Sequence, residues 1–185
     1  MLYVKFFQPD NNKYFSRHAV SKLLYDVCGL EDAAHLIKTE SGVRPYIENA
    51  DFDFSVADTA GAVVVAVSYA GKKIPDVICF NISCKRIGVD VECADRTVKK
   101  ESMLRVLKKL YSEKEREYVS AGTEGDSRRF LEIWTKKESI LKATGEGLSA
   151  VSRADTYNYG CDFLKTWYTD LGDKTYIVSL AGIMH

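Results

Sequence analysis

The first half of the chain alternates between apolar runs and one stretch with helical spacing. The runs predict strands: LYVKFF, FDFSV, AVVVAVS, DVICFNIS and RIGVDVE. Between Ser16 and Cys28, apolar residues recur at the three- and four-residue steps of an amphipathic helix, and Gly29 is a natural end for it. We therefore expect the first half to combine a helix with a small sheet.

The second half begins with helices and ends with strands. Apolar residues at helical steps predict a helix between Met103 and Tyr111, and Ser112 with Glu115 forms a capping-box pattern that starts a second helix. A third helix is expected from about Ser127 to Thr144, followed by three C-terminal strands, DTYNYG, FLKTWYTD and TYIVSLAG. The order of elements predicts the α+β class.

Composition narrows the classes of protein that need to be considered. The 185 residues are 46% hydrophobic, which is enough to build a core, and the 26 basic and 26 acidic residues cancel. A chain without net charge creates no field of one sign directed at nucleic acid or membrane, so we expect neither as a partner. The run AGAVVVAV is too short to cross a bilayer and the N-terminus lacks the apolar centre of a signal peptide, so we expect a cytoplasmic protein.

Cysteine and histidine give no indication of a zinc site. The five cysteines are an odd number, and the three histidines are scattered along the chain. Their spacing does not match the ligand patterns of zinc sites, so we expect reduced, mostly buried thiols.

The strand IGVDVE carries two carboxylates one residue apart. Because side chains alternate along a strand, Asp90 and Glu92 share one face with Gly88, and the apolar residues occupy the other. Two like charges roughly 7 Å apart repel each other, and a hard divalent cation with oxygen ligands removes that cost. The ordinary alternative is a pair of acidic residues on the solvated face of a sheet.

The segment FLEIWTKKESILKATGEG places an acidic residue on an apolar helix stripe. Phe130, Trp134 and Glu138 are spaced four apart, and Leu141 follows on the same stripe. A carboxylate at such a position needs a positive partner, which is either Lys142, one turn further on, or a metal ion. The alternative is a simple ion pair between Glu138 and Lys142 at the edge of the core.

Together, the two motifs provide three oxygen ligands and a cation that binds phosphate. The ligands are the carboxylates of Asp90, Glu92 and Glu138, and the cation is Lys142. Magnesium with a bound diphosphate is usually held in this way, by few protein carboxylates, with water and substrate oxygens completing the shell.

These residues resemble the paired signature of the Sfp-type 4′-phosphopantetheinyl transferases. IGVDVE is similar to the family pattern G-[IV]-D-[IV]-E, and WTKKESILK is similar to W-[ST]-x-K-E-[SA]-x-x-K, with Glu138 lying 46 residues after Glu92. The segment GVRPYIENADFDFS is similar to the G-[KR]-P-Y segment of the family, and the resemblance extends from about Gly42 to Ser149.

The resemblance implies a fold of two similar lobes. Each lobe would be a helix packed on a small antiparallel sheet, and the two would form a pseudo-dimer with the active site in the cleft between them. We expect an N-terminal lobe at residues 1–95 and a C-terminal lobe at residues 96–185. Because both lobes lie on one chain, we expect a monomer.

The resemblance also implies a reaction. The protein would be a holo-[acyl-carrier-protein] synthase type of enzyme that transfers the 4′-phosphopantetheine moiety of coenzyme A to a serine of an apo acyl or peptidyl carrier protein, with magnesium. Asp90, Glu92 and Glu138 would bind the metal. Glu138, or water on the metal, would take the serine proton, and Lys142 would hold the phosphates and the leaving group.

Further basic residues would bind coenzyme A if the resemblance holds position by position. Lys137 matches the first motif lysine, and Arg44 matches the cation for the nucleotide end. Arg17 on the first helix is a candidate in addition to these residues and Lys142. One position departs from the family: where a phosphate-contacting histidine is usual, the preferred alignment places Asp58, which would repel a diphosphate. That alignment makes YAGKKIPDVICFNIS an insertion, with an extra hairpin as one form for it.

Two other functions remain open at this stage. The first is a non-catalytic relative that binds coenzyme A or a carrier protein, and it is suggested by the missing histidine. Retention of Asp90, Glu92, Glu138 and Lys142 argues against it, because buried carboxylates without a partner are costly. The second is a metal-dependent phosphohydrolase, which would release phosphopantetheine without any carrier.

Overall fold

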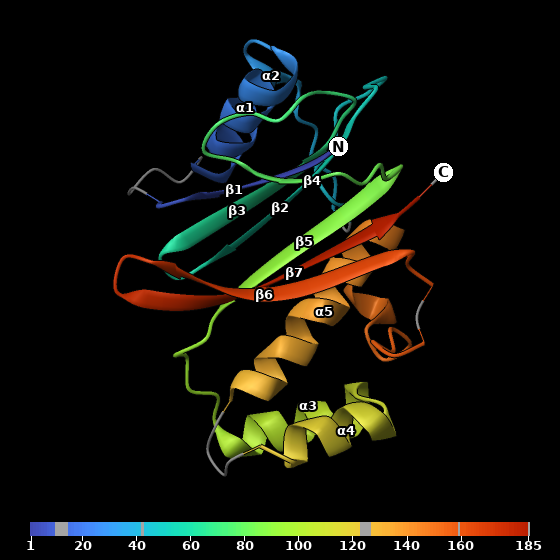
Figure 1. Ribbon diagram of the computed structural model, residues 1–185. Helices are drawn as coiled ribbons and strands as arrows, with labels where there is room; N and C mark the ends of the chain where they lie inside the picture. The colour runs from blue at the N-terminus through green and yellow to red at the C-terminus, as the bar shows by residue number, and fades with distance from the viewer. Residues whose placement is uncertain (10–14, 42, 123–126, 159, 185) are drawn as a thin grey trace.

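Two antiparallel sheets lie face to face, and each is covered by a helix on its outer side (Figure 1). The computed structural model describes residues 1–9, 15–41, 43–122, 127–158 and 160–184. The predicted α+β class is confirmed by this arrangement. No helix in the described part of the chain is long and apolar enough to cross a membrane.

The first sheet has the strand order β2-β3-β1-β4. Its outer face is covered by α1, because the apolar stripe of that helix, including Leu23 and Leu24, packs on the sheet. The elements of this part are β1 (Leu2–Phe7), α1 (Phe15–Cys28), α2 (Ala33–Leu36), β2 (Asp53–Thr59), β3 (Ala62–Ser68) and β4 (Ile78–Phe80).

The second sheet has the strand order β5-β7-β6, and α5 lies along its outer face (Figure 1). The smaller helices α3 and α4 lie beyond α5, at the end of the molecule furthest from α1. The elements are β5 (Arg86–Cys93), α3 (Lys100–Leu110), α4 (Glu113–Ser120), α5 (Arg128–Thr144), the short 3₁₀ helix η1 (Leu148–Ala150), β6 (Phe163–Leu171) and β7 (Lys174–Ile183).

The two halves repeat one order of elements. In the first, a strand, a helix and a hairpin (β1, α1, β2, β3) form a sheet in which β3 lies between β2 and β1; in the second, β5, α5, β6 and β7 form a sheet in which β7 lies between β6 and β5. Because β5 pairs with β7, the expected boundary after residue 95 would cut the second sheet. The division between the sheets lies just before Arg86, at the start of β5.

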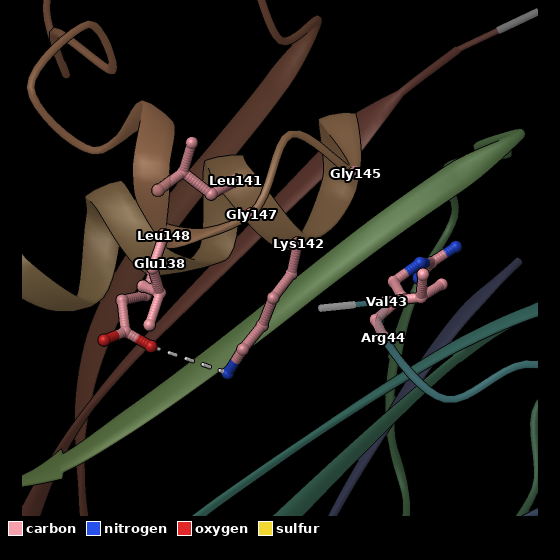
Figure 2. A pocket seen from close by; sticks show the side chains of 8 residues that line it. All are labelled: Val43, Arg44, Glu138, Leu141, Lys142, Gly145, Gly147 and Leu148. Atoms are coloured by element: carbon pink, nitrogen blue, oxygen red, sulfur yellow. Dashed lines mark ion pairs between the residues drawn. The ribbon is translucent and has the colours of Figure 1, made fainter. Parts of the chain in front are cut away.

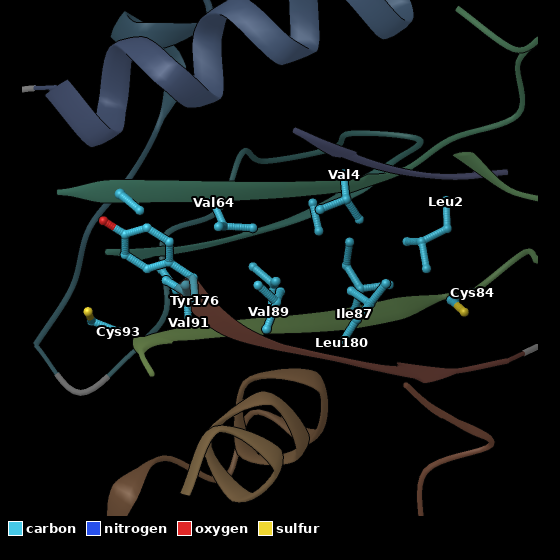
Figure 3. Packing of buried hydrophobic residues seen from close by; sticks show 14 residues of the cluster. Leu2, Val4, Val64, Cys84, Ile87, Val89, Val91, Cys93, Tyr176 and Leu180 are labelled. Carbon is cyan, nitrogen blue, oxygen red and sulfur yellow. The ribbon is translucent and has the colours of Figure 1, made fainter. Parts of the chain in front are cut away.

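The core between the sheets confirms the alternation predicted for β5. Ile87, Val89 and Val91 point toward the first sheet, where they pack against residues such as Val4 and Val64 (Figure 3). The opposite face of β5 carries Asp90 and lies against α5. The strand therefore presents its apolar side chains to the core and its acidic ones to the helix.

Gly88 allows α5 to lie directly against β5. A Cβ atom at this position would overlap the carbonyl oxygen of Ser139 and lie 2.5 Å from the backbone nitrogen of Ala143. Any residue larger than glycine would push the helix away from the strand. This close approach brings the side chains of α5 within reach of Asp90.

Strand β5 of the second sheet is joined to strand β2 of the first by hydrogen bonds between backbone N–H groups and side chains. The N–H of Ile87 donates to Oδ2 of Asp53 at 2.8 Å, and the N–H of Val89 donates to Oγ of Ser55 at 3.0 Å. Both acceptors belong to β2, so this strand satisfies the free edge of β5 without pairing with it. The two halves are therefore held in a fixed relation next to Asp90.

Two of the expected strands differ in the structure. The run DVICFNIS forms a strand only at Ile78–Phe80, which pairs with β1 at the edge of the first sheet, so the segment adds an edge strand and no separate hairpin. The segment DTYNYG is a turn at the residues that the structure describes, although its aromatic residues favour strands. The helix bounds and the capping box of Ser112 and Glu115 are close to those expected.

Candidate active site

A cavity of about 340 Å³ opens beside the C-terminal half of α5 (Figure 2). Charged groups from both halves of the molecule meet there, since Arg44 comes from the segment before β2 whereas Glu138 and Lys142 come from α5. The lining residues are Val43, Arg44, Glu138, Leu141, Lys142, Gly145, Gly147 and Leu148.

Asp90, Glu138 and Lys142 are in contact next to this cavity. Nζ of Lys142 lies 2.7 Å from Oδ1 of Asp90 and 4.0 Å from Oε2 of Glu138, and it also donates to the carbonyl of Val89 at 3.0 Å. The carboxyl groups of Asp90 and Glu138 are close enough for each to influence the pKa of the other. The structure thus brings together residues that are 52 positions apart in the sequence.

Burial raises the pKa values of both carboxyl groups, those of Asp90 and Glu138. Burial raises the pKa of Asp90 to about 7; the ammonium of Lys142 opposes this shift, and the charges of Glu138 and Glu92 add to it. Burial also raises the pKa of Glu138, again against Lys142 and with Glu92 adding to the rise. Raised pKa values favour the protonated form of both carboxyl groups while no further cation is bound.

Glu92 points away from this pair toward another cation. One guanidinium nitrogen of Arg96, Nη1, lies 2.8 Å from Oε1 and 2.7 Å from Oε2 of Glu92, and Oγ1 of Thr59 lies 3.4 Å from Oε2. Glu92 nevertheless remains close enough to influence the pKa values of Asp90 and Glu138. The third expected ligand is therefore near the other two but engaged elsewhere.

The oxygen donors fit a divalent cation in part. In the described residues, no group of three or more His, Cys, Asp and Glu side chains is placed to hold a metal ion. Burial, followed by the neighbouring carboxylates, nevertheless raises the pKa values of Asp90 and Glu138, and a divalent cation would favour their ionised forms through the oxygen ligands that Mg²⁺ prefers. The donor set thus fits an ion held by Asp90 and Glu138, with Glu92 as a further ligand once it leaves Arg96.

Arg44 supports the junction of the two sheets at the wall of the cavity. Its Nη1 donates to the carbonyls of Phe54 at 2.9 Å and Ile87 at 2.8 Å, and its Nη2 pairs with Asp53. Arg44 is also one of the residues that line the cavity. A cation held so firmly is preorganised to meet an anionic ligand.

The family comparison agrees with this geometry. Residues 86–172 match the model of the 4′-phosphopantetheinyl transferase superfamily. Over this segment, which is slightly less than half of the chain, the protein is similar to that superfamily. It contains Asp90, Glu92, Glu138 and Lys142, whereas Arg44 lies outside it. A search of curated proteins found no match.

Lys137 lies outside the cavity beside α5. The side chain has 0% exposed surface; its Nζ lies 2.9 Å from Oε2 of Glu115 and donates to the carbonyl of Ala154 at 2.5 Å. Its ammonium also lies 5.3 Å from the ring centroid of Tyr111. A fully enclosed ammonium does not reach a phosphate in the cavity, so the structure gives Lys137 a place in the core where we expected a contact with coenzyme A.

Arg17 is also remote from the cavity beside α5. It lies on α1, where its Nη1 donates to the carbonyl of Ala34 at 3.1 Å and joins α1 to the short helix α2. Both sheets separate α1 from α5 (Figure 1). In this structure the expected coenzyme contact of Arg17 is therefore replaced by a contact between helices.

Asp58 faces away from the carboxylates of the site. Strand alternation places it on the same face of β2 as Phe54 and Val56, which pack toward α1, whereas Thr59 on the opposite face reaches Glu92. The expected repulsion between Asp58 and a bound diphosphate is reduced by this orientation.

Sequence reasoning missed the apolar rim of the cavity. Val43, Leu141 and Leu148 line it, and the side chains of Val43 and Leu148 are largely exposed. Gly145 and Gly147 have positive φ values of 76° and 70° and turn the chain back from the end of α5, which places Leu148 at the rim. The GEG sequence gives no sign that the leucine after it is exposed.

Proposed function

We propose that this protein transfers the 4′-phosphopantetheine arm of coenzyme A to a serine hydroxyl of an apo acyl or peptidyl carrier protein, as an Sfp-type member of its superfamily. The observation that carries the proposal is the contact of Asp90, Glu138 and Lys142 beside a cavity, inside the segment that matches the superfamily. The repeated order of elements supports a two-lobed pseudo-dimer on one chain.

The proposed reaction displaces one phosphate oxygen by another. The serine oxygen of the carrier forms a bond to the phosphorus that bears the pantetheine arm, and the bond from that phosphorus to the second phosphate breaks. Adenosine 3′,5′-bisphosphate leaves, and the serine proton passes to the carboxylate of Glu138. A carboxyl group whose pKa is raised by burial is a better base than an exposed one, which suits Glu138 for this role.

Lys142 would stabilise the charge that develops on the leaving phosphate. Its ammonium is fixed by Asp90 and by the carbonyl of Val89, so it needs no reorganisation during the reaction. Mg²⁺ held by Asp90, Glu138 and Glu92 would reduce the negative charge of the diphosphate.

The nucleotide half of coenzyme A would enter the cavity beside Arg44. The volume of about 340 Å³ is within the range of small-molecule sites, and the rim of Val43, Leu141 and Leu148 offers an apolar surface to a base. The guanidinium of Arg44 would then face a phosphate of the nucleotide.

The direct test is incubation of the protein with coenzyme A, Mg²⁺ and a panel of apo carrier proteins, followed by mass spectrometry of the carriers. We expect a mass gain equal to one phosphopantetheine arm, and its loss when the carrier serine is replaced by alanine. Glu138→Gln should abolish the gain, whereas Glu113→Gln, an exposed glutamate on α4, should preserve it.

Other outcomes would assign a different function. Coenzyme A binding without any mass gain across the panel would favour a non-catalytic relative. Free phosphopantetheine in the absence of a carrier would identify a phosphohydrolase.

A further inference from the structure

Arg96 holds the carboxylate that the metal site lacks. Its Nη1 contacts both carboxylate oxygens of Glu92, at 2.8 Å and 2.7 Å. Both oxygens that a metal ion would use as ligands are therefore already engaged by this nitrogen. A guanidinium at this distance also repels a dication approaching Glu92. Asp90 and Glu138, by contrast, share the ammonium of Lys142.

The chain fixes Arg96 in this position through a tight turn. The N–H of Arg96 donates to the carbonyl of Cys93 at 3.1 Å, immediately after β5, and the N–H of Ala94 donates to the carbonyl of Thr175 at 2.8 Å. The turn folds the arginine back over Glu92. Its backbone is therefore anchored to β7 although its side chain lies at the surface.

Separating the guanidinium of Arg96 from Glu92 requires little free energy. The side chain of Arg96 is 54% exposed, whereas that of Glu92 is 12% exposed. An ion pair with such an exposed partner contributes little, because water replaces the contact when it opens. Both side chains also line a cavity of about 360 Å³ between α5 and the segment that leads into α3, which gives the arginine room to move.

We propose that Arg96 is a positioning residue that competes with the divalent cation for Glu92 and so sets the affinity of the site for metal. The inference rests on the proposed function, because it takes Glu92 as one of the metal ligands. Arg96 acts through Glu92 and does not itself contact the reacting atoms.

The test measures binding of Mn²⁺ alone, by isothermal titration calorimetry without coenzyme A or carrier. Arg96→Gln should bind Mn²⁺ roughly fivefold more tightly than wild type, the upper end for a partly exposed ion pair, and Arg96→Lys should lie between them. Thermal unfolding of each variant checks that it is folded.

Two controls separate this contact from a general change in charge. Lys99→Gln removes an equal charge from an exposed position nearby and should leave Mn²⁺ affinity unchanged at physiological salt. In a Glu92→Gln background, Arg96→Gln should have little further effect, because the residue through which Arg96 acts is gone.

Several results would overturn the inference. These are a wild-type or weaker affinity in Arg96→Gln, an equal gain in Lys99→Gln, a gain that persists without Glu92, and no measurable Mn²⁺ binding by either wild type or Arg96→Gln. The carrier assay reports separately on the proposed function. Transfer by a protein in which Arg96→Gln leaves Mn²⁺ affinity unchanged would remove only the role of Arg96, whereas tighter Mn²⁺ binding without transfer would remove only the transferase.

Discussion

Two lysines on α5, five residues apart, form ion pairs of opposite character. Lys137 pairs with Glu115 at 2.9 Å and both side chains are 0% exposed. Lys142 pairs with Asp90 at 2.7 Å, retains 24% exposure and lines the cavity with Glu138 (Figure 2). One helix thus contributes a closed pair to the core and an open cluster to the candidate active site.

The two groups differ in how their charges are balanced. At the closed pair, Glu115 also accepts from the N–H groups of Ser112 and Thr156, and Lys137 donates to carbonyls, so every charged group has partners. At the open cluster, two carboxyls share one ammonium and their pKa values rise. A balanced, closed pair holds structure together, whereas an unbalanced, open cluster is prepared for a charged ligand.

The largest effect should come from breaking the closed pair. Lys137→Ala leaves Glu115 buried without its cation, and we expect the free energy of unfolding to fall by about 3–5 kcal/mol in chemical denaturation. The matched change Lys136→Ala, next to it on the helix but with a partly exposed pair to Glu132, should cost less than about 1 kcal/mol. Similar losses for the two variants would contradict the contrast.

A substitution in the open cluster should reduce transfer activity more than stability. Lys142→Met should lower the transfer rate about 100-fold, because the leaving phosphate loses a fixed charge. Its stability should change by at least about 2 kcal/mol less than that of Lys137→Ala, since burial already raises the pKa values of Asp90 and Glu138 and favours their uncharged forms once the ammonium is gone. Single-turnover transfer assays and denaturation curves measure the two effects, and an active Lys142→Met enzyme would refute the assignment.

The pH dependence of stability should report the raised pKa of Asp90. The folded pKa of Asp90 is about 7 and its ordinary value is 3.8, so between these values the folded state binds more protons than the unfolded state. Stability of the metal-free wild type should therefore fall, relative to Asp90→Asn, as pH rises from 4 to 7, by on the order of 3 kcal/mol. Parallel curves of stability against pH for the wild type and Asp90→Asn would show that the pKa of Asp90 is not raised in the folded state.

The smallest effect is expected when the closed pair is replaced as a whole. The double variant Glu115→Leu/Lys137→Met removes both charges together, so its stability should lie within about 1 kcal/mol of wild type or exceed it. Transfer activity should survive. A loss as large as that of Lys137→Ala alone would mean that the hydrogen bonds of the pair, and not its charge balance, stabilise this region.

The sequence predicted the elements whose signals are local. Helical spacing and cap chemistry located α1, α4 and α5 closely, and alternation assigned the two faces of β5. The strand expected at DTYNYG was wrong because aromatic content alone does not provide a partner strand. Helical spacing also contained information that the prediction did not use. Residues 137 and 142 lie about 140° apart around the helix axis, so their two lysine side chains cannot face the same cavity.

By itself, the sequence determined the α+β class and the local pairing of Glu138 with Lys142, because these follow from the periods of strand and helix over a few residues. Only the tertiary structure decided that Asp90 meets them, that Lys137 is enclosed and that Glu92 is held by Arg96. Each of these contacts depends on the close approach of segments far apart in the chain or on a turn at the end of a strand. Gly88 is an example, because its missing side chain lets α5 lie against β5 and brings Lys142 to Asp90.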